Sequence, residues 1–400
     1  MRRFGLPAYN LHDVEGLARR RLPRGIFEYI AGGAEDGLAV VRNRDAFARV
    51  GLVPRILRDV TGRSAGSSLM GQPAAMPVAI APTGSAGLVW FQGELALAKA
   101  AAGAGVPFTL ATNAMTSMET IAREAGGRLW FQLNMFAHRP HAYDLLERAQ
   151  RLGFEALVLT VDASVVPNRE YNARNGFTVP FRFSWRSAFD MLQHPRWLLG
   201  VMGRYALASG MPRFENFPPE LRDKVTGFST ARSASRCEDL SWADLQTLRQ
   251  RWPGKLLVKG VLRPDDAARA VALGVDGVIV SNHGGRTVDS APAPLEMLPA
   301  VAHAVAGRAQ VLLDGGIRRG SDVIKALALG AHGVLLGRPT LYGTALAGEA
   351  GASQVLHLLQ TEIERELGLL GYQSLDQLAD PGLLHLTRRG ETWADTTTAA

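Results

Sequence analysis

The sequence predicts an α/β protein built on an eight-stranded parallel barrel, the (β/α)8 or TIM-barrel fold. Eight short apolar runs recur along the chain, with helical patterns between them. Apolar runs of this length are typical of strands buried on both faces of a parallel sheet. The runs span residues 77–337, which agrees with the roughly 250 residues of a typical barrel. A doubly wound sheet is the alternative, but no G-x-G-x-x-G motif follows the first run.

The predicted strands are, in chain order, residues 77–81, 107–111, 129–133, 156–161, 256–260, 277–281, 309–313 and 333–337. Helices are expected between them, for example over 93–104 and 265–273. Residues 1–76 contain a helix candidate over 12–21 and then the segment 26–33. We expect three parts: an extension over 1–76 that packs on the barrel, the barrel over 77–370, and a C-terminal tail over 371–400.

The amino-acid composition limits the classes of protein to which this chain can belong. Hydrophobic residues make up 47% and charged residues 20% of the chain, so it can bury a full core. Cys237 is the only cysteine, which excludes an internal disulfide framework and fits a reducing compartment. We find neither a secretory signal nor an apolar run of the roughly 18–20 residues that cross a bilayer. The expected location is the cytoplasm, with peripheral attachment to the inner membrane as the alternative.

The charge balance of 44 Lys and Arg against 37 Asp and Glu gives 44 − 37 = +7. The arginines are dispersed and no nucleic-acid-binding signature accompanies them, so we expect no nucleic-acid partner. Anionic small ligands or an anionic membrane surface explain the excess of positive charge.

An insertion over 177–241, rich in Pro, Arg and aromatic residues, separates the fourth and fifth strands. Insertions after a barrel strand lie over the C-terminal face, where this fold carries its chemistry. Within it, 185–214 predicts an amphipathic basic and aromatic helix that lies on an anionic membrane. A lid or an oligomer contact is the other interpretation, and both stay open. Its apolar and basic residues are Trp185, Phe189, Trp197, Leu198, Leu199 and Met202, with Arg186, Arg196, Arg204 and Arg213.

The motif Ser281-Asn282-His283-Gly284-Gly285-Arg286 follows the sixth strand directly. Side chains at the carboxyl end of a barrel strand point into the mouth, and the glycines let a ligand approach the backbone closely. His283 is a candidate proton acceptor near neutral pH, and Arg286 offers a planar fork to a carboxylate.

Glycine-rich turns follow the seventh and eighth strands, at 314–322 and 337–339. Such turns, each opening a helix, form the usual phosphate cradle of this fold. Arg318 and Arg338 are candidates to hold the anion, and Asp314 suits a ribityl or sugar hydroxyl. These residues alone do not decide whether the phosphorylated ligand is a substrate or a cofactor.

Two more strand ends carry charged residues. Lys259 lies at the end of the fifth strand. Three interpretations of its role stay open: a Schiff-base lysine, a charge partner for a bound anion, or a lysine in a salt bridge within the barrel. Asp162 ends the fourth strand, where it either caps a helix or orients His283. Arg169 is a candidate second carboxylate clamp. No metal-binding motif occurs, and the histidines of 138–141 predict only a surface turn, so we expect no metal.

Several motifs occur together: YIAGGAEDG from Tyr29, LVKG at 257–260, SNHGGR at 281–286 and DGGIRRGSDVIKALALGA at 314–331. In combination they resemble the family of FMN-dependent 2-hydroxy-acid oxidases and dehydrogenases, over nearly the whole chain to about Leu370. Glycolate oxidase, lactate oxidase, L-lactate dehydrogenase and mandelate dehydrogenase are members. The sequence HPRW at 194–197, inside the insertion, resembles the corresponding insertion of the mandelate dehydrogenase branch, which binds membrane.

The resemblance implies a role for each matching position. His283 matches the active-site base with Asp162 as its partner, and Lys259 falls beside flavin N1. Arg169, Arg286 and Tyr29 match the residues that bind substrate. The implied FMN contacts are Pro82, Thr83, Gly84, Thr112, Gln132, Thr160, Ser281 and Gly284, with Asp314, Gly315, Gly316, Arg318, Gly337 and Arg338 around the ribityl phosphate. The resemblance thereby favours a cofactor at the cradle and argues against a Schiff base at Lys259.

Three residues depart from the family pattern. Asn134 follows Phe131-Gln132-Leu133, where the family carries a tyrosine, and Asn113 stands where glycolate oxidases often have tryptophan. Ala111 replaces a common flavin-contacting serine. Asn134 cannot supply a phenol to the substrate, and Asn113 implies a wider or more polar substrate pocket. Ala111 implies that one hydrogen bond to the flavin is missing.

The resemblance therefore implies oxidation of an L-2-hydroxy acid to the 2-oxo acid, with a bulkier or aryl acid favoured over glycolate or lactate. Gly84, where many oxidases have alanine, and the insertion favour a quinone or respiratory-chain acceptor over oxygen. The family precedent implies a homotetramer. A family member with an atypical substrate is one alternative, and a flavin-free aldolase or isomerase barrel that uses Lys259 belongs to a different class.

Overall fold

The computed structural model describes residues 6–175, 185–222 and 237–386. The predicted barrel forms its centre, with eight parallel strands closed in the order β10-β11-β4-β5-β6-β7-β8-β9. Each strand begins and ends within one residue of the predicted bounds, so the prediction of a (β/α)8 fold is confirmed. The strands are β4 (Val78–Ile80), β5 (Phe108–Ala111), β6 (Leu129–Leu133), β7 (Ala156–Thr160), β8 (Lys255–Val261), β9 (Gly277–Val280), β10 (Gln310–Asp314) and β11 (Gly333–Leu336).

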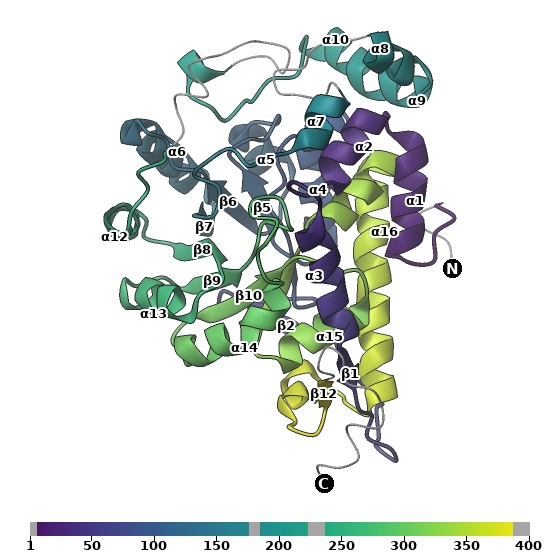
Figure 1. The fold of residues 1–400 in the computed structure, drawn as a ribbon, viewed down its shortest axis with the longest axis vertical. Helices are drawn as coiled ribbons and strands as arrows, with labels where there is room; N and C mark the ends of the chain where they lie inside the picture. The colour runs from purple at the N-terminus through teal and green to yellow at the C-terminus, as the bar shows by residue number, and fades with distance from the viewer. Residues whose placement is uncertain (1–5, 176–184, 223–236, 387–400) are drawn as a thin grey trace.

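Helices connect the strands and cover the outside of the barrel (Figure 1). The predicted helices over 93–104 and 265–273 are α4 and α13. The last helix, α16, is interrupted at Ala347 and Gly348, where the backbone leaves helical geometry. The helices are α4 (Gly93–Gly103), α5 (Met118–Glu124), α6 (Arg139–Arg151), α12 (Trp242–Arg251), α13 (Pro264–Ala272), α14 (Pro294–Val305), α15 (Gly320–Ala328) and α16 (Arg338–Leu370), with the 3-10 turn η1 (Ala86–Leu88) before α4.

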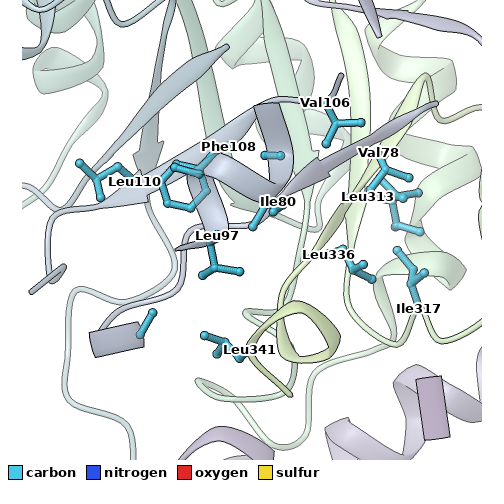
Figure 2. Packing of buried hydrophobic residues seen from close by; sticks show 14 of the residues in the cluster. Val78, Ile80, Leu97, Val106, Phe108, Leu110, Leu313, Ile317, Leu336 and Leu341 are labelled. Carbon is cyan, nitrogen blue, oxygen red and sulfur yellow. The ribbon is translucent and has the colours of Figure 1, made fainter. Parts of the chain in front are cut away.

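Strand periodicity divides the side chains into an inner and an outer set. Outward-facing residues such as Val78, Ile80 and Phe108 pack against Leu97 of α4 and Leu341 of α16 (Figure 2). A separate inner cluster fills the barrel and includes Trp130, Val158, Leu257, Ile279, Leu312 and Leu335. All of these side chains are buried, so the barrel is a packed core and its chemistry is confined to the mouth.

A hairpin of β2 (Ser67–Leu69) and β3 (Gln72–Ala74) closes the end of the barrel opposite the mouth. Its Leu69 and Met70 belong to the inner cluster. A Cβ atom on Gly333 would lie 2.6 Å from Leu69 Cδ2, so a side chain at the first residue of β11 would displace Leu69 of the hairpin.

The N-terminal segment wraps along the side of the barrel. Asn10 caps the first helix, whose bounds agree with the predicted 12–21. That helix packs on α16, and β1 pairs antiparallel with β12 near the end of the chain. The elements are α1 (Leu11–Arg21), α2 (Arg24–Ala31), α3 (Leu38–Ala48) and β1 (Val50–Leu52), with η4 (Leu375–Ala379) and β12 (Leu384–Leu386) at the other end.

The insertion differs from the single helix expected over 185–214. It consists of short helices grouped at one end of the molecule (Figure 1). The helical conformation is interrupted at His194, because Pro195 disfavours helical geometry in the residue before it. The helices of the insertion are α8 (Trp185–Leu192), α9 (Pro195–Trp197), the π-helix η2 (Leu198–Gly203), α10 (Arg204–Ala208) and the 3-10 turn η3 (Pro219–Leu221). The short helix α7 (Glu170–Arg174) precedes the insertion. The rest of the predicted insertion (177–184 and 223–236), the side chain of Arg186 and 387–400 of the predicted tail lie outside the described residues.

The large apolar side chains of the insertion do not all lie on its outer surface. Trp197 is buried, and its Nε1 donates a hydrogen bond of 2.7 Å to the Leu88 carbonyl oxygen in the loop after β4. Trp185, Phe189 and Leu199 are exposed. Trp197 therefore anchors the insertion to the barrel, while the other three residues face outward.

Candidate active site

The site residues occupy the same inward-facing positions of the barrel strands as the inner cluster, nearer the mouth. Two residues beyond the inner-cluster positions Val158, Leu257, Ile279 and Leu312, the same side of the strands carries Thr160, Lys259, Ser281 and Asp314. All four of these polar side chains are buried. Asp162 and His283 follow after two further residues. The alternation of strand side chains thus changes the interior from apolar to polar at the mouth.

His283 and Asp162 form a hydrogen-bonded pair at the mouth. The distance from His283 Nδ1 to Asp162 Oδ1 is 2.9 Å. An ionised carboxylate only accepts, so Nδ1 carries the hydrogen and Nε2 is left as the basic nitrogen. Burial and the positive charge of Lys259 lower the pKa of His283, although Asp162 opposes them. The imidazole is therefore neutral at neutral pH and able to accept a proton.

Asp162 keeps its negative charge next to that imidazole. Burial opposes its ionisation, but His283 and Lys259 outweigh burial and hold the pKa of Asp162 below its usual value. The backbone at His283 has φ +56°, a conformation that residues other than glycine rarely adopt. The Ser281 hydroxyl accepts a hydrogen bond of 3.0 Å from the His283 amide and so holds this turn.

Lys259 is a buried ammonium rather than a nucleophilic amine. Its Nζ lies 3.0 Å from Asp314 Oδ2 and 3.0 Å from Ser281 Oγ. Burial disfavours the charge, but Asp314 and Asp162 outweigh burial and raise the pKa of Lys259. A lysine that stays protonated does not attack a carbonyl carbon, which removes the basis for a Schiff-base aldolase.

Three of the predicted substrate residues come together beside the N-terminal segment. Arg286 donates hydrogen bonds of 3.1 and 2.9 Å to the carbonyl oxygens of Ile30 and Gly32, and its guanidinium lies 5.3 Å from the centre of the Tyr29 ring. Arg169 Nη2 donates a bond of 3.1 Å to the Arg286 carbonyl oxygen. The carbonyls at the end of α2 have no helical partners of their own, which makes them acceptors for these cations.

Arg338 binds the same end of α2. It donates hydrogen bonds of 2.9 Å to Ile30 O, 2.9 Å to Gly32 O and 2.8 Å to Gly284 O. Burial, followed by the nearby Arg286, lowers the pKa of Arg338 to about 10. The cations at this side of the mouth therefore repel one another, and an anion bound there would relieve the repulsion.

The glycine-rich turn after β10 is only partly available to an anion. Asp322 Oδ2 accepts hydrogen bonds from the amides of Arg318 and Arg319, at 2.8 and 3.0 Å, so the first turn of α15 is already capped. The Arg318 side chain is also buried, which lowers its pKa. A Cβ atom on Gly316 would lie 2.1 Å from the Asn43 carbonyl oxygen, so glycine is required where α3 crosses the turn.

The opposite side of the mouth is lined by uncharged polar residues. Gln132 Nε2 donates to Thr160 Oγ1 at 2.8 Å and to Asn134 Oδ1 at 2.9 Å. The Thr112 hydroxyl donates to the Gln132 carbonyl at 2.7 Å and accepts from the Asn134 amide at 3.0 Å, so it ties β5 to β6. The loop after β4 holds Pro82, Thr83 and Gly84, all partly buried, and Gly337 follows β11.

His138 and His141 lie at the start of α6 rather than in a turn, with ring centres 4.6 Å apart. Among the residues that the structure describes, no group of three or more His, Cys, Asp or Glu side chains is arranged to hold a metal ion.

Two buried residues near the site were not predicted. Asn43 of α3 exchanges two hydrogen bonds with Asn282, next to His283. Glu94 of α4 accepts hydrogen bonds from the amides of Gly87 and Met115, both at 3.1 Å, and so joins the loops after β4 and β5. Neither Asn43 nor Glu94 belongs to a recognisable sequence motif. The only signal for Glu94 is a buried carboxylate in a helix that consists mostly of small residues.

Comparisons with known proteins identify the family of this chain. A sequence model of the FMN-dependent dehydrogenase family matches residues 18–385. The chain is 43% identical to the (S)-mandelate dehydrogenase of Pseudomonas putida, over 93% of this chain and 92% of that protein. It is 39% identical to a putative L-lactate dehydrogenase of Mycobacterium tuberculosis, over 99% of this chain and 93% of that protein.

Among solved structures, the crystal structure of the monotopic membrane protein (S)-mandelate dehydrogenase matches with a TM-score of 0.90 and 41% identity. The match covers 96% of this chain and 100% of that one. The chain therefore belongs to the FMN-dependent dehydrogenase family and is an FMN-dependent 2-hydroxy-acid oxidoreductase.

Proposed function

We propose that this enzyme oxidises a bulky or aryl-bearing L-2-hydroxy acid of the mandelate type to the 2-oxo acid. The observation that carries the proposal is the neutral His283, held by Asp162 at 2.9 Å on the rim that also bears Arg169 and Arg286. A base beside two carboxylate-binding cations is what the removal of a proton from a 2-hydroxy acid needs. The mandelate-named relatives support an aryl substituent.

The residues present fit FMN. Asp314 Oδ1 is buried and has no hydrogen-bond partner among the described residues, so it is an acceptor for a ribityl hydroxyl. The mutual repulsion of Arg338, Arg286 and Arg318 fits the charge of a phosphate. Lys259, Gln132, Thr160 and Ser281 are proposed to contact the flavin ring, with Gly84 and Gly284 allowing close approach. Pro82, Thr83, Thr112, Gly315, Gly316 and Gly337 are proposed as further backbone or packing contacts.

In the proposed mechanism, Arg169 and Arg286 bind the substrate carboxylate through charge-assisted hydrogen bonds of about 1.5–3 kcal/mol each. Tyr29 donates to the same substrate. His283 Nε2 removes a proton, from the hydroxyl group in a hydride route or from C2 in a carbanion route. Asp162 then stabilises the imidazolium that forms. When bound, FMN supplies the acceptor for the two electrons that leave C2.

The insertion supports a peripheral membrane location and a membrane-borne acceptor. Trp185 and Leu207 are 94% and 92% exposed, and Phe189, Leu192 and Leu199 are exposed with them. Arg204 lies on the same helices, with its guanidinium 4.6 Å from the centre of the Phe91 ring. An apolar surface with basic residues at its edge is suited to an anionic lipid surface. No helix among the described residues is long and apolar enough to cross a bilayer.

The test is anaerobic mixing of the enzyme with a panel of L-2-hydroxy acids while flavin absorbance near ~450 nm is followed. We expect (S)-mandelate to bleach the flavin faster than L-lactate or glycolate, and faster bleaching by lactate would contradict the proposed substrate class. The reduced enzyme is then mixed with a soluble quinone or with oxygen. Fast reoxidation by the quinone with little peroxide is expected, whereas stoichiometric peroxide would identify an oxidase.

The assembly is proposed to be a homotetramer. Light scattering of the purified enzyme tests this directly, because the monomer mass is 43.0 kDa.

A further inference from the structure

A cavity of about 590 Å³ lies at the end of the barrel opposite the mouth. Lys255 and Gln310, the first residues of β8 and β10, line it. Asp276 and His332, which directly precede β9 and β11, line it as well. Pockets that bind small molecules usually enclose about 300–1,000 Å³. The candidate active site uses the carboxyl ends of the same strands, so this cavity is separate from it.

Part of the lining is apolar. Met70, in the turn between β2 and β3, lines the cavity together with Val275 and Ala309, and all three side chains are buried. Gln310 Oε1 accepts a hydrogen bond of 2.8 Å from the Met70 amide and so fixes this turn against the strand ends. Apolar lining beside a few polar groups is typical of a site for a small organic molecule rather than for a bare ion.

The basic side chains of the lining retain hydrogen-bond donors. Arg308 Nε and Nη2 donate to the carbonyl oxygens of Val305 and Ala304, at 3.0 and 2.7 Å, which holds the guanidinium at the end of α14. Its Nη1 has no acceptor in the part of the chain that the structure describes. Lys255 Nζ uses one of its three N–H groups for Asp276 Oδ1, at 2.9 Å. Both cations can therefore still bind a ligand.

His332 adds a donor whose tautomer is fixed. Its Nδ1 accepts a hydrogen bond of 3.1 Å from the Val311 amide, so Nε2 carries the ring hydrogen. No described residue accepts a hydrogen bond from this Nε2. The imidazole thus contributes an N–H group to the lining and no acceptor.

Asp276 is the one carboxylate among the described residues that line the cavity, and both of its oxygens are already bonded. Oδ1 accepts from Lys255, and Oδ2 accepts from the Leu256 amide and from Arg249 Nη1, each at 2.9 Å. The charged and imidazole side chains of the lining therefore offer a ligand donors and positive charge. Donors of this kind bind phosphate and carboxylate groups.

We infer that this cavity is a second ligand site, which binds a small organic anion composed of a phosphate or carboxylate group and an apolar body. Arg308, Lys255 and His332 bind the anionic group, and Met70 and Val275 contact the body. The inference does not depend on the proposed function, because none of these residues belongs to the mouth.

The test is fluorine NMR of the FMN-saturated enzyme with two probes, 4-fluorophenyl phosphate and 4-fluorobenzoate. We expect saturable line broadening of at least one probe at millimolar concentration, and the tighter probe identifies the preferred anionic group. In Arg308→Glu its Kd should rise by about tenfold or more, because a charge-assisted hydrogen bond is lost and a like charge is introduced. His332→Phe, which removes only the ring donor, should raise the Kd by a smaller factor.

Arg20→Glu and His12→Phe, on the exposed face of α1, are the matched controls and should bind the probe like the wild type. The uncharged 4-fluorobenzyl alcohol should bind more weakly than the anions, and equal binding would show that the cavity does not select an anion. Absence of saturable binding would also overturn the inference. So would binding that persists in Arg308→Glu and disappears in Arg169→Met, because the probe would then lie at the mouth.

Discussion

The carboxamides of Asn43 and Asn282 exchange hydrogen bonds of 2.9 and 2.8 Å across 239 residues of sequence. Both side chains are buried. Asn282 Oδ1 also accepts from the Gly285 amide at 3.1 Å, so the pair braces both sides of His283. A helix outside the barrel thereby fixes the turn that carries the proposed base.

Replacement of Asn43 by alanine should therefore affect both stability and catalysis. It leaves the Asn282 carboxamide buried without its partner, which costs about 1–3 kcal/mol of unfolding free energy. We also expect slower flavin reduction by substrate, because the turn around His283 loosens. Urea denaturation and stopped-flow absorbance measure the two effects. Asp45→Ala, on the exposed side of the same helix, should change neither.

Replacement of His283 by glutamine tests the proposed base. The variant should stay yellow, because the cradle for FMN does not depend on the imidazole. Its flavin reduction by substrate should fall by about 10²–10⁴, the usual contribution of a general base. His303→Gln, on the exposed surface of α14, is the matched control. If His283→Gln is reduced at the wild-type rate in a single turnover, another group is the base.

The pH dependence of kcat/KM should report the lowered pKa of His283. The base works only when neutral, so activity should be constant around neutral pH and fall on the acid side, below the ordinary histidine value of about 6.5. In Asp162→Asn the negative partner that raises this pKa is gone, so the acid limb should move to lower pH. A shift to higher pH in that variant would contradict the assigned electrostatics.

Replacement of Asp314 by alanine should leave Lys259 as an unpaired charge inside the barrel. Loss of one partner of a buried ion pair costs about 3–5 kcal/mol. Urea unfolding of the FMN-free protein tests this, and a fluorescence titration should show weaker FMN binding. Asp265→Ala breaks an ion pair on the surface and should leave both measurements unchanged. Equal stability of the two variants would mean that the Lys259–Asp314 pair contributes nothing.

The double variant Leu199→Glu/Leu207→Glu should reduce cosedimentation with vesicles that contain anionic lipid. The two changes place charge on the exposed apolar face of the insertion and oppose its entry into the lipid interface. Leu369→Glu, at another exposed leucine on α16, should bind vesicles like the wild type. If the wild type itself does not sediment with the vesicles, the apolar face serves another contact.

The sequence predicted the barrel well because each strand is buried on both faces and reads as one apolar run. The residues of the mouth lie directly after those runs, so strand periodicity also brought His283, Asp162, Lys259 and Asp314 into one group. The insertion was predicted poorly because its hydrophobic pattern continues through Pro195, where the backbone does not. Asn43 and Glu94 were missed because their partners lie in distant loops, which no local pattern encodes.

The arginines that anchor on Ile30 and Gly32 have a consequence for biosynthesis. The end of α2 leaves the ribosome long before Arg286 and Arg338, which follow it by 254 and 306 residues. At typical translation speeds the interval is roughly 10–60 s. During that time the nascent chain cannot assemble the mouth of the barrel, so flavin incorporation must follow the synthesis of nearly the whole polypeptide.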